Sequence, residues 1–422
     1  MTARLLPPLT GIVCAVIGCT PMELFPGSAG QLDAPSALRS SSAEEHHEAD
    51  VNAWAPVTKS PWEIPEGEVR DAREESLAKA CGTRDGALDR VAHELAAARA
   101  RGLGVDPDAV SGKMRAAGEP HVRPRVVFAS GHAPLDDVPI KRRLTSEAFG
   151  GREGARRPTR CGIALMGTPH GGEVFVAVAV EALADMAPLA TRARAGEWLS
   201  FEAKLHVPAR SAKLVILGPR GAPRTVPTSL DAATGRARAK LTLDQPGAFT
   251  LQLVGDLDEG PRPLLEARVF ADVAPTAPGE DPIAPGEDAA ADLDEGREAD
   301  ALVKMLGAVR AMEGLPPLRR EPRLEALARA HAEQMRDRRE VAHDVGEGDF
   351  RARFEGEASM AARAVGENVA RAASVRLAHR ALYASPSHRI NLLRNDYTHV
   401  GVGVARAPDG SVYVCEAFAA AR

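Results

Sequence analysis

Residues 385–404 read SPSHRINLLRNDYTHVGVGV and decide the fold of the C-terminal part of this chain. Ser385 followed by Pro386 is typical of a helix start, because Ser favours the N-cap and Pro fits the first helical position. Residues 400–404 then alternate Val with Gly, and a Pro-Asp-Gly turn leads into a second apolar stretch at 411–418. The stretch therefore predicts a short helix followed by a β-hairpin.

Two amphipathic helices are predicted before this stretch. The first has Leu302, Leu306 and Val309 on one face and ends at a Gly-Leu-Pro-Pro sequence. The second begins at Pro322, and its apolar face consists of Leu324, Leu327, His331 and Met335. Because His331 lies on this apolar face, we interpret it as a buried core histidine rather than a ligand. Residues 297–422 are therefore expected to form one α+β domain.

Together these elements resemble the CAP superfamily (cysteine-rich secretory proteins, antigen 5 and pathogenesis-related proteins), in its bacterial SCP-like branch. The matching elements are, in order, AHAEQM at 330–335, His343, GENVA at 366–370, SPSHRINLL at 385–393 and YTHVGVGV at 397–404. The resemblance covers under a third of the chain. It implies an α-β-α sandwich with a central antiparallel sheet.

The resemblance also implies a cleft. Family members with a complete site hold a His, Glu, Glu, His tetrad there, sometimes with zinc. By motif, His343 matches the first His and Glu367 the first Glu, whereas the second Glu falls near Ser385 and the second His at Asp396. The tetrad is thus incomplete. His388 lies one helical turn past Ser385 and could complete a His343, Glu367 and His388 zinc site, because zinc accepts two imidazoles and one carboxylate and keeps a position for water.

The candidate cleft residues are therefore His343, Glu367, Asn368, His388 and Asp396, and several of them also have a structural interpretation. Glu367 could orient its own loop by accepting backbone N–H groups. Asn368 could bond to the backbone in the turn, and His388 could serve the N-terminus of its helix. We assign no catalytic residue, except that Glu367 would be the catalytic group if the protein were a hydrolase.

Residues 1–19 predict export as a lipoprotein. The apolar run at 5–17 has about 13 residues, which suits a signal peptide and is too short to span a membrane. It ends in VIGC at 16–19, which resembles the lipobox of bacterial lipoproteins, so Cys19 is the expected lipidation site. Thr20 favours the outer membrane over the inner one. The alternative is an ordinary signal peptide with a chance cysteine, and both interpretations export the chain.

Export places the remaining cysteines in an oxidising compartment. Cys14 leaves with the signal peptide and Cys19 carries the lipid, which leaves Cys81, Cys161 and Cys415. Since Cys81 and Cys161 lie in one predicted domain and Cys415 in another, we expect a Cys81–Cys161 disulfide and a buried, unreactive Cys415. Three buried thiols are the alternative.

Between the signal peptide and residue 297 the chain divides into four predicted segments. Residues 20–70 lack periodicity and predict a disordered tether, whereas 71–185 predict a small α/β domain. The latter contains a glycine-bearing hairpin similar to that of the C-terminal domain, so it could be a degenerate CAP-like copy. The alternative is two unrelated hairpins with similar glycines. Short strands separated by Gly and Pro turns at 190–274 predict an immunoglobulin-like β-sandwich that acts as a spacer. Residues 275–296 repeat Ala-Pro-Gly-Glu-Asp and predict an acidic linker.

Composition argues against nucleic-acid binding. The 422 residues carry a net charge of -5, and aromatic residues make up 4%, which leaves neither a basic excess for phosphates nor many rings for base stacking. We predict a protein lipid-anchored in the cell envelope that acts by binding a lipid, an envelope glycan or a peptide. The alternatives are a metal-dependent hydrolase and a structural envelope protein without a small-molecule ligand. Binding is favoured over catalysis because the sequence contains no GxSxG, HExxH or Walker motif.

Overall fold

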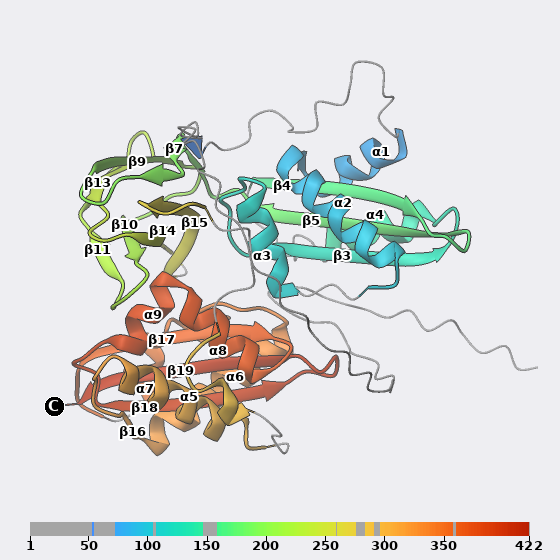
Figure 1. Ribbon diagram of the computed structural model, residues 1–422. Helices are drawn as coiled ribbons and strands as arrows, with labels where there is room; N and C mark the ends of the chain where they lie inside the picture. Colours follow the sequence, from blue (N-terminus) through green and yellow to red (C-terminus); the bar gives the residue numbers. More distant parts are fainter. Residues whose placement is uncertain are drawn as a thin grey trace, which may run out of the picture.

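The computed structural model describes residues 53–54, 72–103, 107–146, 158–258, 260–275, 283–290, 296–357 and 360–421. They form three domains, which follow one another in the chain and are coloured blue to teal, green to yellow, and orange to red in Figure 1. The predicted signal peptide, Cys19 and nearly all of the predicted tether lie outside the described residues. The exception is β1 (Ala53–Trp54), which pairs with β7 (Leu189–Ala190). Within the described ranges, no helix is long and apolar enough to cross a membrane.

The C-terminal domain is built on a four-stranded sheet with the order β16-β18-β19-β17. β16 pairs in parallel with β18, and the other neighbours are antiparallel. The strands are β16 (Arg319–Arg320), β17 (Ala362–Ala372), β18 (His399–Arg406) and β19 (Val412–Ala421). One face is covered by α5 (Glu298–Met312), α8 (Val375–Ala384) and α9 (Pro386–Leu393), and the other by α6 (Pro322–Arg338) and α7 (Phe350–Glu357). These layers are those of the predicted α-β-α sandwich.

The Val-Gly alternation in β18 explains how α6 packs so closely on the sheet. The valines at 400–404 point toward α5, α8 and α9, so the glycines face α6. A Cβ on Gly401 would lie 2.1 Å from the carbonyl carbon of Leu324, and one on Gly403 would lie 2.2 Å from that of Ala328. Only glycine therefore allows the helix backbone to approach β18 at this distance.

The N-terminal domain has the same topology as the C-terminal one. Its sheet has the order β2-β4-β5-β3, with β2 parallel to β4 and the other pairs antiparallel. The strands are β2 (Thr83–Arg84), β3 (Arg125–His132), β4 (Thr159–Gly167) and β5 (Gly172–Glu181). The helices are α1 (Ala72–Cys81), α2 (Gly86–Ala100), α3 (Pro107–Ala116) and α4 (Asp137–Ser146). The one difference in element order is that α4 stands where the C-terminal domain has α8 and α9.

Strand pairing aligns the two domains residue by residue. Gly162 of β4 stands where Gly401 stands in β18, and a Cβ on Gly162 would lie 1.9 Å from the carbonyl carbon of Leu88 in α2. The same registers place Val126 of β3 at the position of Glu367 in β17. The N-terminal copy thus keeps the close contact between helix and sheet but has an apolar residue where the C-terminal copy has its cleft carboxylate.

Between these domains lies a β-domain with two sheets, of order β11-β10-β14-β15-β8 and β12-β13-β9-β6, which share one apolar core. Its strands are β6 (Ala184–Met186), β8 (Arg192–Ala193), β9 (Trp198–Leu205), β10 (Ser211–Leu217), β11 (Arg224–Val226), β12 (Thr228–Asp231), β13 (Arg236–Thr242), β14 (Gly247–Leu257) and β15 (Gly260–Ala271). The predicted boundary at residue 185 falls inside β6, so the β-domain begins earlier than expected. Its immunoglobulin-like character stays a prediction.

The second Ala-Pro-Gly-Glu-Asp repeat differs from the predicted linker. Ala284 is buried in the core that contains α5 and α8. Glu287, in a 3-10 turn at Glu287–Ala290, forms an ion pair with Arg380 of α8 at 2.6 Å. The composition of the repeat is polar, but one buried methyl group and one paired carboxylate fix it to the C-terminal domain.

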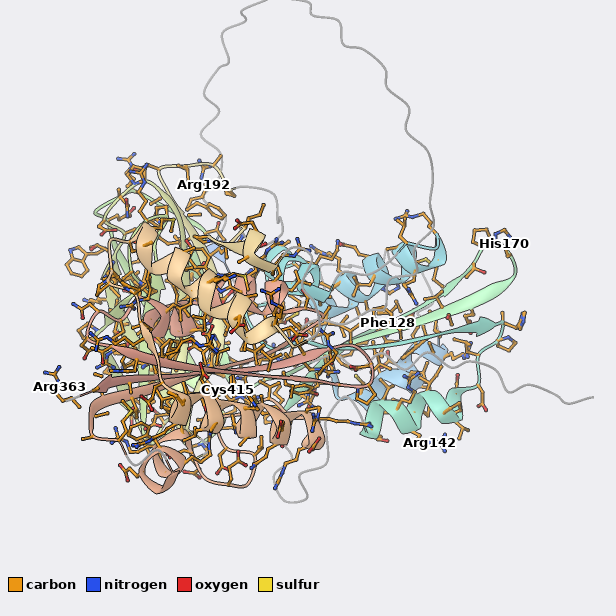
Figure 2. All side chains as sticks on the ribbon, turned by 90° about the horizontal axis from the view of Figure 1, so that it is seen from below. Phe128, Arg142, His170, Arg192, Arg363 and Cys415 are labelled. Carbon is orange, nitrogen blue, oxygen red and sulfur yellow. The ribbon has the colours of Figure 1, made fainter. Side chains whose placement is uncertain are left out.

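Cys81 at the end of α1 and Cys161 in β4 lie in one buried cluster. The hydrogen bond with Cys81 raises the pKa of the Cys161 thiol, and burial adds to this effect. Both residues are free thiols in this structure, so the disulfide between them stays a prediction. Cys415, which Figure 2 shows within the C-terminal sheet, is also a buried free thiol, as expected for an inert side chain.

We expect Gly401→Ala to lower the free energy of unfolding of the C-terminal domain by about 1–3 kcal/mol, because the added methyl group would overlap the backbone of α6. Gly307→Ala is the matched control. Gly307 lies inside α5 with open space around it, so alanine there should stabilise by about 0.5–1 kcal/mol. Calorimetric melting of both variants measures the difference, and equal midpoints would contradict the packing described for β18.

Candidate functional site

Glu367 in β17 is the central carboxylate of the candidate site. Its side chain is 1% exposed, and its Oε2 accepts a hydrogen bond from His343 Nδ1 at 2.8 Å. Its Oε1 accepts from Arg353 at 2.7 Å and from the Cys415 thiol at 3.3 Å. Burial by itself raises the pKa of Glu367, but the hydrogen bond from His343 and the charge of Arg353 hold it below its ordinary value. The residue is therefore an ionised, fully engaged carboxylate.

Arg353, on α7, supplies the positive charge beside Glu367. Besides the carboxylate, its guanidinium donates to the carbonyls of His343 at 3.0 Å and Gly348 at 3.2 Å. It also lies 5.6 Å from the ring centroid of Phe350, within range of a cation-π contact. The side chain is 5% exposed. An internal cation thus already neutralises the carboxylate that the sequence suggested as a metal ligand.

The predicted zinc ligands do not fit a zinc site in this arrangement. In the described ranges, no group of three His, Cys, Asp or Glu side chains could hold a metal ion. Both oxygens of Glu367 are occupied by His343 and Arg353, and His388 Nδ1 bonds to Ser385. A zinc ion at Glu367 would have to compete with the hydrogen bonds from His343 and Arg353 and with the positive charge of Arg353.

His388 occupies the third position of α9 and is held in one orientation. Its Nδ1 lies 2.8 Å from Ser385 Oγ, whereas its Nε2 makes no hydrogen bond in the part of the chain that the structure describes. Burial lowers the pKa of His388 to about 3, and the nearby charges of His343 and Arg123 contribute. His388 is therefore a neutral imidazole with one open nitrogen. Its bond to Ser385, the N-cap residue, agrees with the structural interpretation of a histidine serving its helix start.

The other predicted cleft residues have different roles. Asn368 is fully buried, accepts from Asn391 at 3.0 Å and donates to Glu416 at 3.0 Å, so it joins β17 to α9 and β19. Asp396 is exposed and pairs with Arg394 at 2.6 Å, and no contact brings it to Glu367. The motif position of Asp396 therefore does not place it in the cleft, because the loop before β18 turns its carboxylate toward its own neighbour.

His331 is the buried core histidine that the sequence indicated. Its side chain is 0% exposed and its two ring nitrogens lie 2.5 Å from Glu347 Oε1 and 2.9 Å from the carbonyl of Ala342. Both nitrogens are thus occupied, so His331 supports the loop that carries His343.

Sequence reasoning missed Gln252, a buried residue of β14 that reaches the C-terminal domain. Its Oε1 accepts a hydrogen bond from the backbone N–H of Ser387 at 3.1 Å. Its Nε2 donates to Glu266 at 3.0 Å and to Ser385 Oγ at 3.4 Å. The first turn of α9 is therefore capped from another domain, while the hydroxyl of its own N-cap Ser385 contacts His388 instead. The sequence signal is one glutamine inside an apolar strand.

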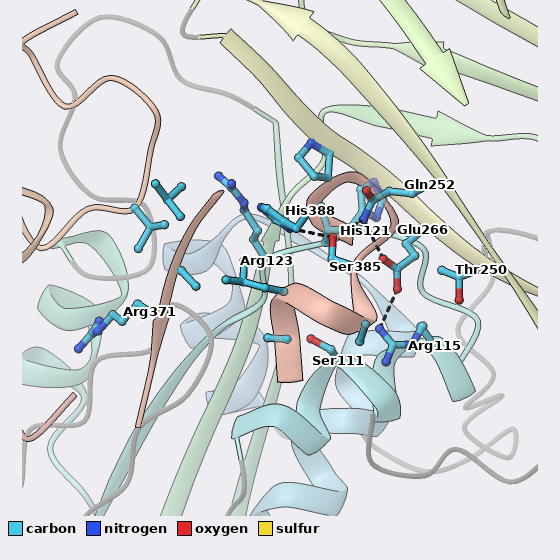
Figure 3. A pocket seen from close by; sticks show the side chains of 18 of the residues that line it. Ser111, Arg115, His121, Arg123, Thr250, Gln252, Glu266, Arg371, Ser385 and His388 are labelled. Carbon is cyan, nitrogen blue, oxygen red and sulfur yellow. Dashed lines mark hydrogen bonds and ion pairs between the residues drawn. The ribbon is translucent and has the colours of Figure 1, made fainter. Parts of the chain in front are cut away.

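A pocket of about 130 Å³ lies where the three domains meet (Figure 3). Residues that line it include Ser385 and His388 of the C-terminal domain, Gln252 and Glu266 of the β-domain, and Arg115 and Arg123 of the N-terminal domain. The cleft side that carries His388 is therefore completed by walls from the other two domains. None of those walls was predicted, because their residues lie far away in the sequence.

Glu416 in β19 is a second buried carboxyl group near this site. It is 0% exposed, its Oε2 accepts from Asn368, and its Oε1 has no partner among the described residues. Burial raises its pKa from 4.5 to about 7. Folding therefore favours the protonated form of Glu416. The contribution of this carboxyl group to the free energy of unfolding is full below pH 4.5 and is lost as the pH rises through about 7.

We expect Glu416→Gln to remove this pH dependence, because the amide keeps an acceptor for Asn368 and carries no charge. At pH 8 the free energy of unfolding of the variant should exceed that of the unmodified protein by about 3 kcal/mol. At pH 4 the two free energies should be similar. Urea unfolding at both pH values measures this, with the exposed Glu355→Gln as control. An equal gain at both pH values would contradict a titrating Glu416.

Arg353→Met should destabilise the protein by about 3–5 kcal/mol, because it leaves the buried Glu367 carboxylate without its cation. Adding Glu367→Gln should recover part of the loss, which a double-mutant cycle of unfolding free energies would show. The same geometry predicts that His343, Glu367 and His388 bind no zinc in calorimetry. Micromolar zinc binding that is lost in His343→Ala/His388→Ala would contradict the site as described.

Residues 303–417 match a family model described as CAP, cysteine-rich secretory protein family. No curated protein matches the chain. Similar solved structures include an outer surface protein from Borrelia burgdorferi, with 19% identity, a TM-score of 0.29, and coverage of 31% of this chain and 97% of that chain.

Two further solved structures are also similar. One is an extracellular protein containing a SCP domain from Bacillus anthracis str. Ames, with 15% identity, a TM-score of 0.28, and coverage of 56% of this chain and 86% of that chain. The other is a cysteine-rich secretory protein from Staphylococcus aureus subsp. aureus Mu50, with 13% identity, a TM-score of 0.25, and coverage of 66% and 91%. At these values the likeness does not extend to function.

Proposed function

We propose that the chain, whose residues 303–417 match the CAP family model, is an exported CAP-domain protein that acts by binding a ligand in the cell envelope. One observation carries the binding function. His388 is fixed by Ser385 through one nitrogen and presents the other to a pocket walled by three domains. A pre-oriented polar group in a small pocket is typical of a recognition site.

The geometry favours binding over hydrolysis. A general base needs a free lone pair and a pKa near the working pH, but both oxygens of Glu367 are engaged and its pKa is lowered. Ser385 contacts His388, yet the remaining nitrogen of this imidazole has no carboxylate partner within the described ranges, unlike the histidine of a catalytic triad. Glu416 has an open oxygen and a pKa of about 7, but it is fully buried and does not belong to the lining of the pocket. The hydrolase alternative thus has neither an accessible base nor an activated nucleophile beside His388.

The dimensions of the pocket bear on the class of ligand. Its volume of about 130 Å³ is below the roughly 300–1,000 Å³ of pockets that enclose drug-sized molecules. Its walls combine Arg, Gln, His and Glu side chains with apolar ones such as Val341, Val369 and Leu382. Among the three ligand classes considered, the small volume therefore favours the end group of an envelope glycan or peptide over a lipid chain.

The envelope location and the lipid anchor rest on the sequence of residues 1–19. Acylation of Cys19 would leave the described domains outside the membrane and attached to it by the chain that precedes them. In fractionated cells, Cys19→Ser should move the protein from the membrane to the soluble fraction; retention in the membrane would exclude this anchor.

We expect the mature protein, purified in detergent, to co-sediment with insoluble cell-wall material, and His388→Ala to reduce the bound fraction several-fold. Vesicles of phosphatidylethanolamine and phosphatidylglycerol form the lipid arm of the experiment. Asp396→Ala is the control, because Asp396 is exposed, pairs with Arg394 of its own loop and is not among the residues that line the pocket. Mass spectrometry of the cell-wall material should show no cleavage. Cleavage would favour the enzyme, and no binding in either arm would favour a structural role.

A further inference from the structure

The Ala-Pro-Gly-Glu-Asp repeat between the β-domain and the C-terminal domain has two identical copies, at 277–281 and 284–288. The second copy is docked on α5 and α8, whereas the first lies outside the described residues. We propose that the first copy is an alternative occupant of the site that holds the second, so that the connection between the two domains is anchored in either of two registers. This exchange is independent of ligand binding in the pocket.

The docking site is formed by four residues of α5 and α8, namely Met305, Ala308, His379 and Arg380. Gly286 meets it with a φ of +82°, a left-handed conformation that favours glycine. A Cβ on Gly286 would lie 2.7 Å from the Cβ of Ala308 and 3.0 Å from the Cα of Met305. The site therefore accepts only glycine at this position, and Gly279 supplies it in the first copy.

The docking site also selects the glutamate that follows this glycine. Glu287 accepts two hydrogen bonds from the guanidinium of Arg380, at 2.8 and 2.6 Å, and a third from the backbone N–H of Ala284 at 2.6 Å. Burial by itself raises the pKa of Glu287, but the hydrogen bond from Arg380 brings it below its ordinary value, so the residue docks as a carboxylate. Its counterpart in the first copy is Glu280.

Alanine and proline at the start of the repeat also contact the domain. Ala284 is 2% exposed, and the carbonyl of Pro285 accepts a hydrogen bond from His379 Nε2 at 3.2 Å. The preceding Ile283 is 76% exposed, so the site does not select the residue before the repeat. The first copy therefore has every residue of the repeat that the docking site recognises.

One hydrogen bond after the repeat distinguishes the two copies. The backbone N–H of Ala289 donates to the carbonyl of Gly286 at 2.9 Å and closes the turn that follows the second copy. The residue at the same position after the first copy is Pro282, which has no N–H. The second copy is thus the preferred occupant, and the first replaces it when the second is weakened.

A change of occupant moves seven residues from one side of the docking site to the other, because the two copies begin at Ala277 and Ala284. With the first copy docked, residues 272–276 alone join the end of β15 to the site. Such a short connection spans at most about 20 Å. The register therefore sets how far the β-domain can move from the C-terminal domain.

Thermal melting of the full-length protein tests the exchange with valine in place of the two glycines. Gly279→Val alone should leave the melting midpoint unchanged, and Gly286→Val should lower it only slightly, because the first copy takes the site. The double variant should lower the midpoint at least twice as much as Gly286→Val does. A double variant that melts like Gly286→Val would overturn the proposal. If Gly286→Val does not fold, Glu280→Ala, Glu287→Ala and their combination are compared in the same way.

Pro282→Ala gives the first copy the N–H that it lacks, so it tests the register itself. In the Gly286→Val background it should recover at least half of the loss in melting midpoint. Pro275→Ala is the matched control, because Pro275 is an exposed proline before the repeat, and it should recover nothing. Recovery by both substitutions, or by neither, would overturn the exchange.

Light scattering distinguishes exchange within one molecule from docking between molecules. The first copy is joined to the site by its own chain, so its effective concentration there exceeds that of another molecule. Gly286→Val should therefore have the same mass in solution as the unmodified protein. A doubled mass that the double variant lacks would show docking between two copies of the chain and would overturn the two registers.

Discussion

The hydrogen bond from the Ser387 backbone to Gln252 is the interaction on which the arrangement of the site depends. The first turn of a helix needs acceptors from outside the helix. In α9 the hydroxyl of Ser385 is engaged with His388, so the β-domain supplies the acceptor. This single amide joins two domains and fixes the start of α9, because its oxygen accepts from the backbone of α9 while its nitrogen donates to Glu266 of the β-domain.

The features that the sequence predicted are those encoded locally. The start of α9 at Ser385 and Pro386 and the strand with alternating Val and Gly follow from propensity and spacing over a few residues. Arg353 and Gln252 could not be found in this way, since each acts on a residue from a different element, and Gln252 on a different domain. Asp396 shows the converse limit, because a motif position does not fix the direction of a side chain in a loop.

The two domains of common topology share the close contact between helix and sheet but differ at the cleft. Both keep a glycine against the helix backbone, Gly162 in one and Gly401 in the other, because this contact builds the fold. Only the C-terminal domain has a glutamate at the position that Val126 occupies in the N-terminal domain. The N-terminal domain lacks the cleft carboxylate, but it contributes Arg115 and Arg123 to the wall of the pocket.

The cap on α9 also bears on how the protein should be dissected for experiments. A fragment of residues 283–422 would retain its sheet and both apolar cores, so it would look intact by circular dichroism. It would nevertheless expose the first turn of α9 to water and remove two of the three walls around His388. If such a fragment bound no ligand in a screen, the result would reflect the surface exposed by the truncation and would not apply to the full-length protein.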